Sequence, residues 1–252
     1  MSRFRCGGRG RWQVLPLLAA GLLAGCGSPA GPARGPTGGP ELADLAATLL
    51  ARGRPEAAVA LLEPVVRRGG PPALAHLLGA ALLRSGRAAE ALAWLDAALA
   101  RAPEAAAIHH DRGRALDALG RSREAWASYR RALRLAPFRA AAANDLGFSL
   151  LAAGRTGEAR REFERALALD PGLEEARSNL ALAWLVAGRP ERALAVLEAS
   201  RPPALARSDL GALAELAGRR ELAGRLYREA LALDPSLRMA SRNLARLEEA
   251  AR

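Results

Sequence analysis

The chain has 252 residues and a formal net charge of +11 at pH 7. It contains 61 Ala and 45 Leu but only ten Phe, Trp or Tyr residues. Alanine, leucine, arginine and glutamate favour helices, and the scarcity of β-branched and aromatic residues argues against a sheet protein. Half of the residues are apolar, which argues against disorder over most of the length. The composition therefore predicts an all-α protein.

Residues 1–25 have the three parts of a secretory signal peptide. Arg3, Arg5, Arg9 and Arg11 precede an apolar stretch from Trp12 to Gly25, without any acidic residue. That stretch is too short for a membrane-spanning helix, which needs about twenty residues. Its end, Leu23-Ala24-Gly25-Cys26, resembles the lipobox of bacterial lipoproteins. The resemblance implies cleavage before Cys26 and acylation of that cysteine; the alternative is an ordinary signal peptide or a buried apolar helix with an incidental cysteine.

The segment after the predicted cleavage site predicts a tether. The only other cysteine, Cys6, lies in the segment that would be removed, so the mature chain offers no disulfide and no cysteine metal site. Residues 26–40 are rich in Gly and Pro, a composition that neither packs nor forms a helix. We therefore expect an exported, membrane-anchored lipoprotein, which by analogy faces the periplasm from the outer membrane if the cell has two membranes.

Residues 39–237 carry an internal repeat. Pro103, Pro137 and Pro171 are spaced 34 residues apart, and Gly-Arg recurs at 53, 86, 120, 154, 188 and 218. Seven residues before each of these turn glycines stands a Gly or Ala, and five residues after it stands an Ala, followed four places later by a Leu, Tyr or Phe. We expect the small residues to let two helices approach closely, the turn glycine to end the first helix in a left-handed conformation, and the proline to end the second.

This pattern resembles the tetratricopeptide repeat (TPR) family, whose 34-residue unit is a helix-turn-helix pair. The resemblance implies a TPR α-solenoid, a right-handed superhelix of six units within 41–237: 39–71, 72–105, 106–139, 140–173, 174–203 and 204–237. Unit 174–203 is shorter than the others and ends in Arg201-Pro202-Pro203, which predicts a clipped second helix. Residues 238–252 lack a partner helix, and their charges suit a capping helix over the last unit.

The resemblance also implies that the groove formed by the first helices binds a peptide or helical segment of another protein. The second, fifth, ninth, twelfth and thirteenth places of each unit predict the lining. We expect a polar, partly basic part followed by an apolar part, and hence an apolar ligand with an acidic flank; alternatively, single leucines pack against the next unit. The predicted lining residues are His76, Leu83, Arg84, His110, Arg114, Asp117, Asn144, Phe148, Leu151, Ser178, Leu182, Leu185 and Glu215.

Nothing in the sequence indicates an enzyme or a cofactor. No nucleophile with its base, no zinc-protease motif, no phosphate-binding loop and no dinucleotide turn is present. His76 and His110 occupy equivalent places of adjacent units, but two imidazoles are an incomplete metal-ligand set, so we predict no metal site. The charge suggests nucleic acid, but an exported protein meets little of it, and anionic lipid or cell-wall polymer is the better match for that charge.

The functional hypothesis is a lipid-anchored scaffold that binds a segment of another cell-envelope protein and helps to assemble a secretion, pilus or outer-membrane machine. The layout of signal peptide, lipidated cysteine, short tether and repeats is similar to that of pilus-assembly lipoproteins of the type IV and tight-adherence systems. One alternative is a regulator that docks a cell-wall synthase or hydrolase. Another is a cytosolic scaffold, if the signal peptide is wrongly assigned.

Overall fold

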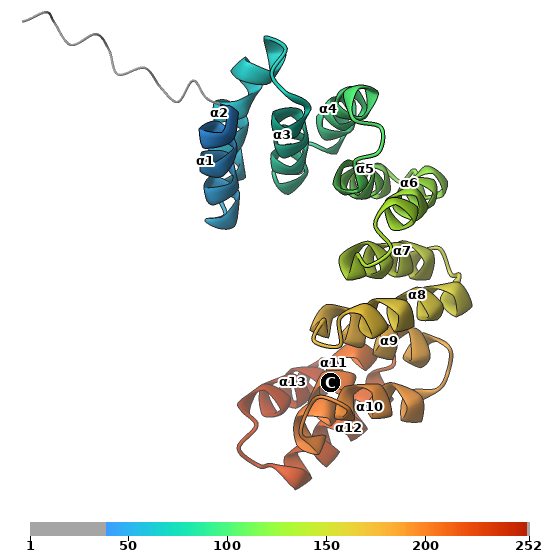
Figure 1. Ribbon diagram of the computed structural model, residues 1–252. Coiled ribbons are helices and arrows are strands. Elements are labelled where there is room, and N and C mark those ends of the chain that lie inside the picture. The colour runs from blue at the N-terminus through green and yellow to red at the C-terminus, as the bar shows by residue number, and fades with distance from the viewer. Residues whose placement is uncertain (1–38, 251–252) are drawn as a thin grey trace, which may run out of the picture. The chain divides into compact units, whose positions relative to one another are not determined.

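Residues 39–250 of the computed structural model are described, and they form thirteen α-helices joined by short turns (Figure 1). The predicted signal peptide, Cys26 and most of the tether lie outside the described residues. The expected all-α architecture is confirmed, and no strand occurs between residues 39 and 250. The helices are α1 (Gly39–Ala51), α2 (Pro55–Arg67), α3 (Pro72–Arg84), α4 (Ala88–Arg101), α5 (Ala106–Ala118), α6 (Ser122–Leu135), α7 (Ala140–Ala152), α8 (Thr156–Leu169), α9 (Glu174–Val186), α10 (Pro190–Glu198), α11 (Pro203–Leu216), α12 (Arg220–Leu233) and α13 (Arg238–Glu249).

Two kinds of contact build the stack of helix pairs. Each helix packs against the next one in the chain, and each odd-numbered helix also packs against the next odd-numbered helix, as α3 does against α5 and α5 against α7. Among the described helices, no such contact joins α2 to α4, α4 to α6 or α6 to α8. The first helices of neighbouring units are thus closer together than the second helices, which places the first helices on the inner side of the local curvature.

Small residues opposite large ones set the distance between the two helices of a unit. A Cβ atom added to Gly147 would lie 2.7 Å from Phe163 Cε1, and one added to Gly113 would lie 2.5 Å from Tyr129 Cε1. Gly79 and Gly211 are equally close to Leu95 and Tyr227. The role that the repeat predicted for these small residues is therefore confirmed: without a side chain, the backbone of the first helix rests directly on the large side chain of the second.

The turn between the two helices requires glycine. All six predicted turn glycines have positive φ, from 68° at Gly53 to 76° at Gly154 and Gly188. Residues with a Cβ atom pay a steric cost in this left-handed region, which glycine avoids. The backbone amides of the glycine and of the residue after it close the helix: Arg155 N donates to Leu150 O and Gly154 N to Leu151 O, both at 2.9 Å.

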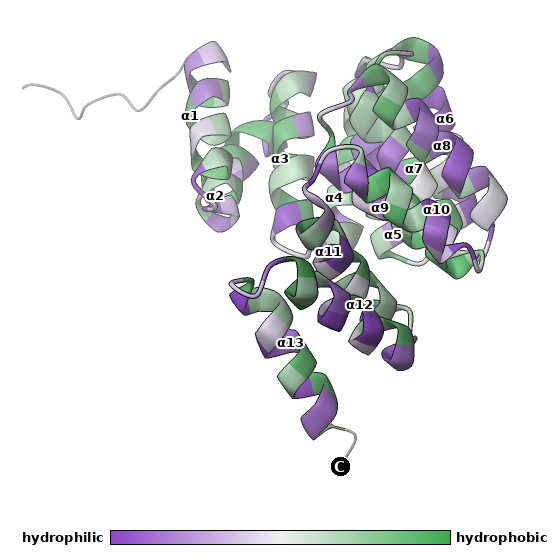
Figure 2. Cartoon of the chain, turned by 90° about the horizontal axis from the view of Figure 1, so that it is seen from below, coloured by the Kyte–Doolittle hydropathy of each residue, from purple (hydrophilic) through white to green (hydrophobic). Residues whose placement is uncertain are grey.

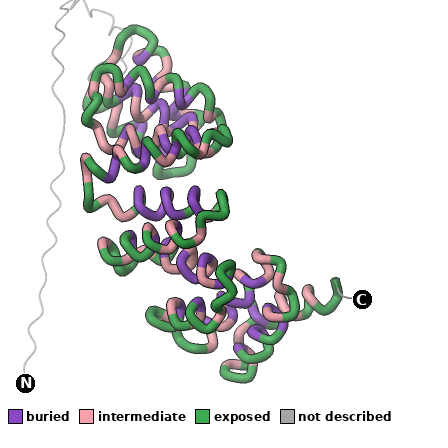
Figure 3. The backbone as a smooth tube through the Cα atoms, turned by 90° about the vertical axis from the view of Figure 1, so that its right-hand side faces the viewer, coloured by how far each residue is buried: buried purple, intermediate pink, exposed green. Residues whose placement is uncertain are grey.

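The fifth unit is where the hydrophobic core divides. The second helix of this unit, α10, has only nine residues, where the other second helices have 13 or 14. Leu180 and Ala183 of α9 belong to the core that extends back to α1, whereas Ala181 and Leu185 belong to a second core that extends to α13. Figure 3 shows buried positions along the helices and exposed positions at the turns.

The last helix covers the end of the second core. α13 packs against α12 and α11, burying Ala240 completely, and Leu244 and Leu247 partly. Most of its other positions are charged, and Figure 2 shows hydrophilic purple segments between hydrophobic green ones along this helix. Across residues 39–250, no helix combines the length and the apolar character that crossing a bilayer demands.

Candidate binding surface on the first helices

Polar side chains connect successive first helices by one repeated contact. His76 Nε2 on α3 donates to Asp111 Oδ2 on α5 at 2.8 Å, and His110 Nε2 on α5 donates to Asp145 Oδ2 on α7 at 2.8 Å. One unit further on, Asn179 Nδ2 on α9 donates to Asn144 Oδ1 on α7 at 2.9 Å. Each contact spans 35 residues. We call these six residues the polar ladder; it joins α3, α5, α7 and α9 side by side.

Each of the two histidines in the polar ladder has a carboxylate partner. Each imidazole pairs with a carboxylate of the next unit rather than with the other histidine. Within residues 39–250, no three His, Cys, Asp or Glu side chains come together as a possible metal-ligand set.

Charge in the ladder is largely compensated. Burial alone would raise the pKa of Asp111. The hydrogen bond from His76 and the charges of His76, His110 and Arg114 together outweigh burial, so the pKa of Asp111 lies below its usual value. Arg114 lies between two aspartates, with Nη1 at 3.4 Å from Asp111 Oδ1 and Nε at 3.8 Å from Asp145 Oδ2. Carboxylates therefore accompany the predicted basic part of the groove and reduce the attraction that it would exert on an acidic flank of a ligand.

Asp117 is the centre of a second network, at the end of α5. Tyr129 OH donates to Asp117 Oδ2 at 3.0 Å, and Ser149 Oγ donates to Asp117 Oδ1 at 2.7 Å. Trp126 Nε1 in turn donates to Ser149 Oγ at 2.8 Å. Burial raises the pKa of Asp117, and the nearby charge of Asp145 adds to this effect. The network connects α5, α6 and α7 by hydrogen bonds. Asp117, predicted to line the groove, therefore also stabilises the packing of these three helices.

An apolar area continues the surface beyond the ladder. Phe148 on α7 is 55% exposed and Val186 on α9 is 48% exposed, while Leu182 and Leu151 are half-buried. Phe148 lies one turn from Asp145, and Leu182 occupies the equivalent place on the next first helix. We call Phe148, Leu182 and Val186 the apolar area. Phe148 and Leu182 are two of the residues predicted for the apolar part of the groove.

Three predicted lining residues are buried instead. Leu185 is fully buried in the second core, so its assignment to the groove is wrong and the alternative of packing against the next unit holds for it. Asn144 and His110 are 2% and 6% exposed, because their polar atoms face the neighbouring unit. Asn144 accepts a hydrogen bond from Asn179, and His110 donates one to Asp145.

The remaining predicted residues divide between surface and structure. Arg84 is exposed, and Leu83 and Ser178 are half-buried. Glu215 accepts hydrogen bonds from Tyr227 OH and, at 2.8 Å, from Arg246 Nη2, so it fastens the capping helix.

Sequence reasoning missed Asp111, Asp145, Asn179 and Val186. The recurrence of His-Asp or Asn-Asn pairs 35 residues apart is the signal that would have found the first three. Val186 stands at the thirteenth place of its unit, next to Leu185, which was predicted to line the groove.

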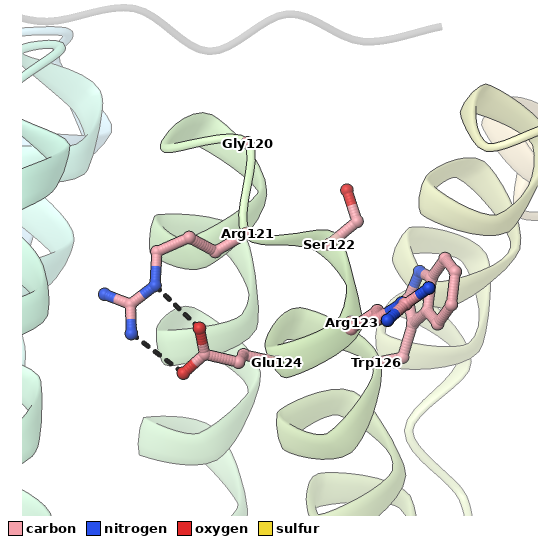
Figure 4. Close-up of a pocket in the computed structure, with 6 residues that line it drawn as sticks. All are labelled: Gly120, Arg121, Ser122, Arg123, Glu124 and Trp126. Carbon is pink, nitrogen blue, oxygen red and sulfur yellow. Dashed lines mark hydrogen bonds and ion pairs between the residues drawn. The ribbon is translucent and has the colours of Figure 1, made fainter.

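A separate hollow lies at a turn, away from the first-helix surface. It has a volume of about 390 Å³ at the turn between α5 and α6, and is lined by Gly120, Arg121, Ser122, Arg123, Glu124 and Trp126 (Figure 4). Arg121 Nε and Nη2 each donate to Glu124 at 2.8 Å, so this arginine is already paired. Arg155 stacks on Trp126 at 4.7 Å from the ring centroid. The hollow thus belongs to the packing of a turn and not to the predicted groove.

Repeated helix pairs whose first helices pack side by side define a helical-repeat protein. Two family models, both described as tetratricopeptide repeat, match the chain: one over residues 44–106 and 110–174, the other over residues 150–216. These matches cover more than half of the sequence. The chain belongs to the tetratricopeptide repeat family, whose fold is that of a scaffold suited to protein–protein interaction and is generally not enzymatic.

Solved structures agree on the fold. A MamA fragment from Desulfovibrio magneticus RS-1 is 20% identical, with a TM-score of 0.55, covering 63% of this chain and 90% of its own. TTC0263, a TPR protein of Thermus thermophilus, is 21% identical, with a TM-score of 0.52, covering 83% of this chain and 98% of its own. YrrB, described as a TPR protein with an unusual peptide-binding site, is 22% identical, with a TM-score of 0.50, covering 68% of this chain and 90% of its own. No curated protein matches the sequence significantly.

Proposed function

We propose that this protein is an exported, lipid-anchored scaffold that binds a segment of another cell-envelope protein along its first helices. It would thereby help to assemble a secretion, pilus or outer-membrane machine. The Leu23-Ala24-Gly25-Cys26 motif and the Gly- and Pro-rich segment after it support the anchor. The family's scaffold fold supports binding of a protein, as does the peptide-binding site described for YrrB.

The observation that carries the binding proposal is the exposure of Phe148. This ring is 55% exposed on a first helix, beside half-buried Leu182 and exposed Val186. Complete burial of a phenylalanine side chain contributes about 1.5–3 kcal/mol, so a partner that covers the apolar area gains a hot spot at its centre. Asp145, one turn from Phe148, and exposed Arg114 place polar groups at the edge of the apolar area.

Crosslinking in cells followed by mass spectrometry would first identify the partner. Phe148→Asp should then abolish capture of that partner while the helical circular dichroism stays unchanged. Leu233→Asp is the matched control, because Leu233 is 56% exposed on α12 and lies outside the apolar area. Capture that survives Phe148→Asp, or that is lost equally in both variants, would place the binding site elsewhere.

The anchor has a separate test. In detergent phase partitioning at high salt, which removes electrostatic contacts with the membrane, Cys26→Ala should move the protein from the detergent phase to the aqueous phase, because stable anchoring depends on the acyl chains. Unchanged partitioning into detergent would contradict lipidation without affecting the test of the first helices.

A further inference from the structure

A basic segment with an exposed aromatic ring lies at the end of α6. Residues 130–139 contain Arg130, Arg131, Arg134 and Arg139 and no acidic residue. Phe138, at the tip of the loop between α6 and α7, is 85% exposed, more than any other large apolar side chain of residues 39–250. The equivalent places after Pro103, Pro171 and Pro235 hold Glu, Gly and Ser. The repeat itself therefore does not require an aromatic ring at this position.

A hollow lies next to this loop, between α6 and α8. Its volume is about 200 Å³, and it is lined by Arg130, Leu133, Arg134, Leu146, Glu162 and Arg165. Arg165 Nη2 reaches Pro137 O at 3.4 Å, which places its guanidinium group beside the Phe138 loop. We call Phe138 together with Arg130, Arg134 and Arg165 the Phe138 patch.

The arginines of the Phe138 patch are only weakly engaged within the chain. Arg130 is 3.9 Å from Glu158, and Arg165 is 3.8 Å from Glu162, distances at the limit of an ion pair. Arg134 is exposed and makes no ion pair or side-chain hydrogen bond with the described residues. Three exposed guanidinium groups around one hollow therefore have capacity to bind an anionic group. Glu162 lines the same hollow, and one of its carboxylate oxygens is buried 3.8 Å from Arg165 Nη1.

We propose that the Phe138 patch binds the surface of a membrane that contains anionic phospholipid. The headgroup phosphate would lie on Arg130, Arg134 and Arg165, and the Phe138 ring would enter the boundary between headgroups and acyl chains. This surface is distinct from the first helices and does not depend on acylation of Cys26.

Charge and apolar exposure together favour a lipid surface over a soluble polyanion. A water-soluble polymer would neutralise the arginines but leave the Phe138 ring in water. A lipid interface accepts both, since basic side chains remain at the headgroups while an aromatic ring is buried beneath them. The loop tip projects the ring outward, with nothing of the described chain covering it.

The test uses the mature chain from residue 26 with Cys26→Ser, so that no acyl group contributes, in sedimentation with vesicles of phosphatidylglycerol or of phosphatidylcholine. We expect binding to phosphatidylglycerol vesicles that falls with salt, and little binding to phosphatidylcholine. Each arginine near an anionic surface contributes about fivefold in affinity, so Arg130→Ala/Arg134→Ala/Arg165→Ala should weaken binding by about 100-fold. Phe138→Ser should weaken it by about tenfold or more.

Matched controls separate the patch from overall charge. Arg123→Ala/Arg220→Ala/Arg225→Ala removes the same charge from exposed arginines of α6 and α12 outside the patch, and Met239→Ser removes another side chain that is 72% exposed. Both should bind nearly as the parent does. Equal losses in test and control variants, or binding to phosphatidylcholine as tight as to phosphatidylglycerol, would overturn the proposal. So would polyphosphate binding that matches vesicle binding and is insensitive to Phe138→Ser.

Discussion

The packing of Gly147 against Phe163 predicts an unusual result for a substitution in a helix. In an exposed helix interior, Gly→Ala adds about 1 kcal/mol of stability through helix propensity. At Gly147, however, the new methyl group would lie 2.7 Å from Phe163 Cε1, 2.8 Å from Cδ1 and 3.1 Å from Cζ. Phe163 is fully buried and cannot swing into solvent. Overpacking of this kind costs about 1–3 kcal/mol, and the contact with three ring atoms places Gly147→Ala in the upper part of that range. We expect a net loss of about 1–2 kcal/mol.

Urea denaturation followed by circular dichroism measures this loss, and Gly157→Ala provides the control. A Cβ atom at Gly157, in the first turn of α8, meets nothing within 4 Å, so that variant should be as stable as the parent or slightly more stable. If Gly147→Ala also proved neutral or stabilising, the close approach of the two helices would not be what selects glycine there.

Two units of the chain have alanine in place of the glycine and leucine in place of the aromatic residue. Units one and five carry Ala46 opposite Leu62 and Ala181 opposite Leu197, all fully buried. Adding Phe163→Leu to Gly147→Ala reproduces this Ala-Leu combination. The double variant should lose less stability than the sum of the two single variants, because units one and five accommodate the Ala-Leu combination with all four residues fully buried. Strict additivity would contradict a direct contact.

Further predictions concern burial, turn geometry and pH, each measured by urea denaturation. Leu185→Ala should cost about 2–5 kcal/mol because Leu185 is fully buried, whereas half-buried Leu182 should cost less when replaced by Ala; similar losses would contradict their placement. Gly154→Ala should cost about 1–2 kcal/mol, since φ is 76° there; an unchanged midpoint would refute the left-handed turn. The folded-state pKa of Asp111 is lowered, so its stabilising contribution is present above its unfolded pKa and is lost as the pH falls through the folded value. The folded-state pKa of Asp117 is raised, so its contribution to stability instead declines as the pH rises from the unfolded towards the folded value. Asp111→Asn and Asp117→Asn should therefore change the pH dependence below neutrality in opposite directions, and shifts of the same sign would refute the two environments.

Contacts within one helix pair could be predicted from the sequence alone. Gly147 and Phe163 are 16 residues apart and joined by a short turn, so their meeting follows from helix periodicity and from the left-handed Gly154. Because such contacts are local, six repetitions of the same spacing determined the family, the helix pairs and the short α10.

The composition of the candidate binding surface depended on contacts between units. Leu185 and Val186 are adjacent in the sequence and equally apolar, yet the first is buried and the second is 48% exposed. Likewise, the 35-residue spacing marks His110 and Asp145 as a candidate pair, but the spacing alone does not determine whether His110 points to solvent or to Asp145. The rotation of each first helix against the next one decides both outcomes, since it determines which side of a helix the neighbouring unit covers. That rotation is set by the packing of two separate helix pairs, and only the tertiary structure contains it.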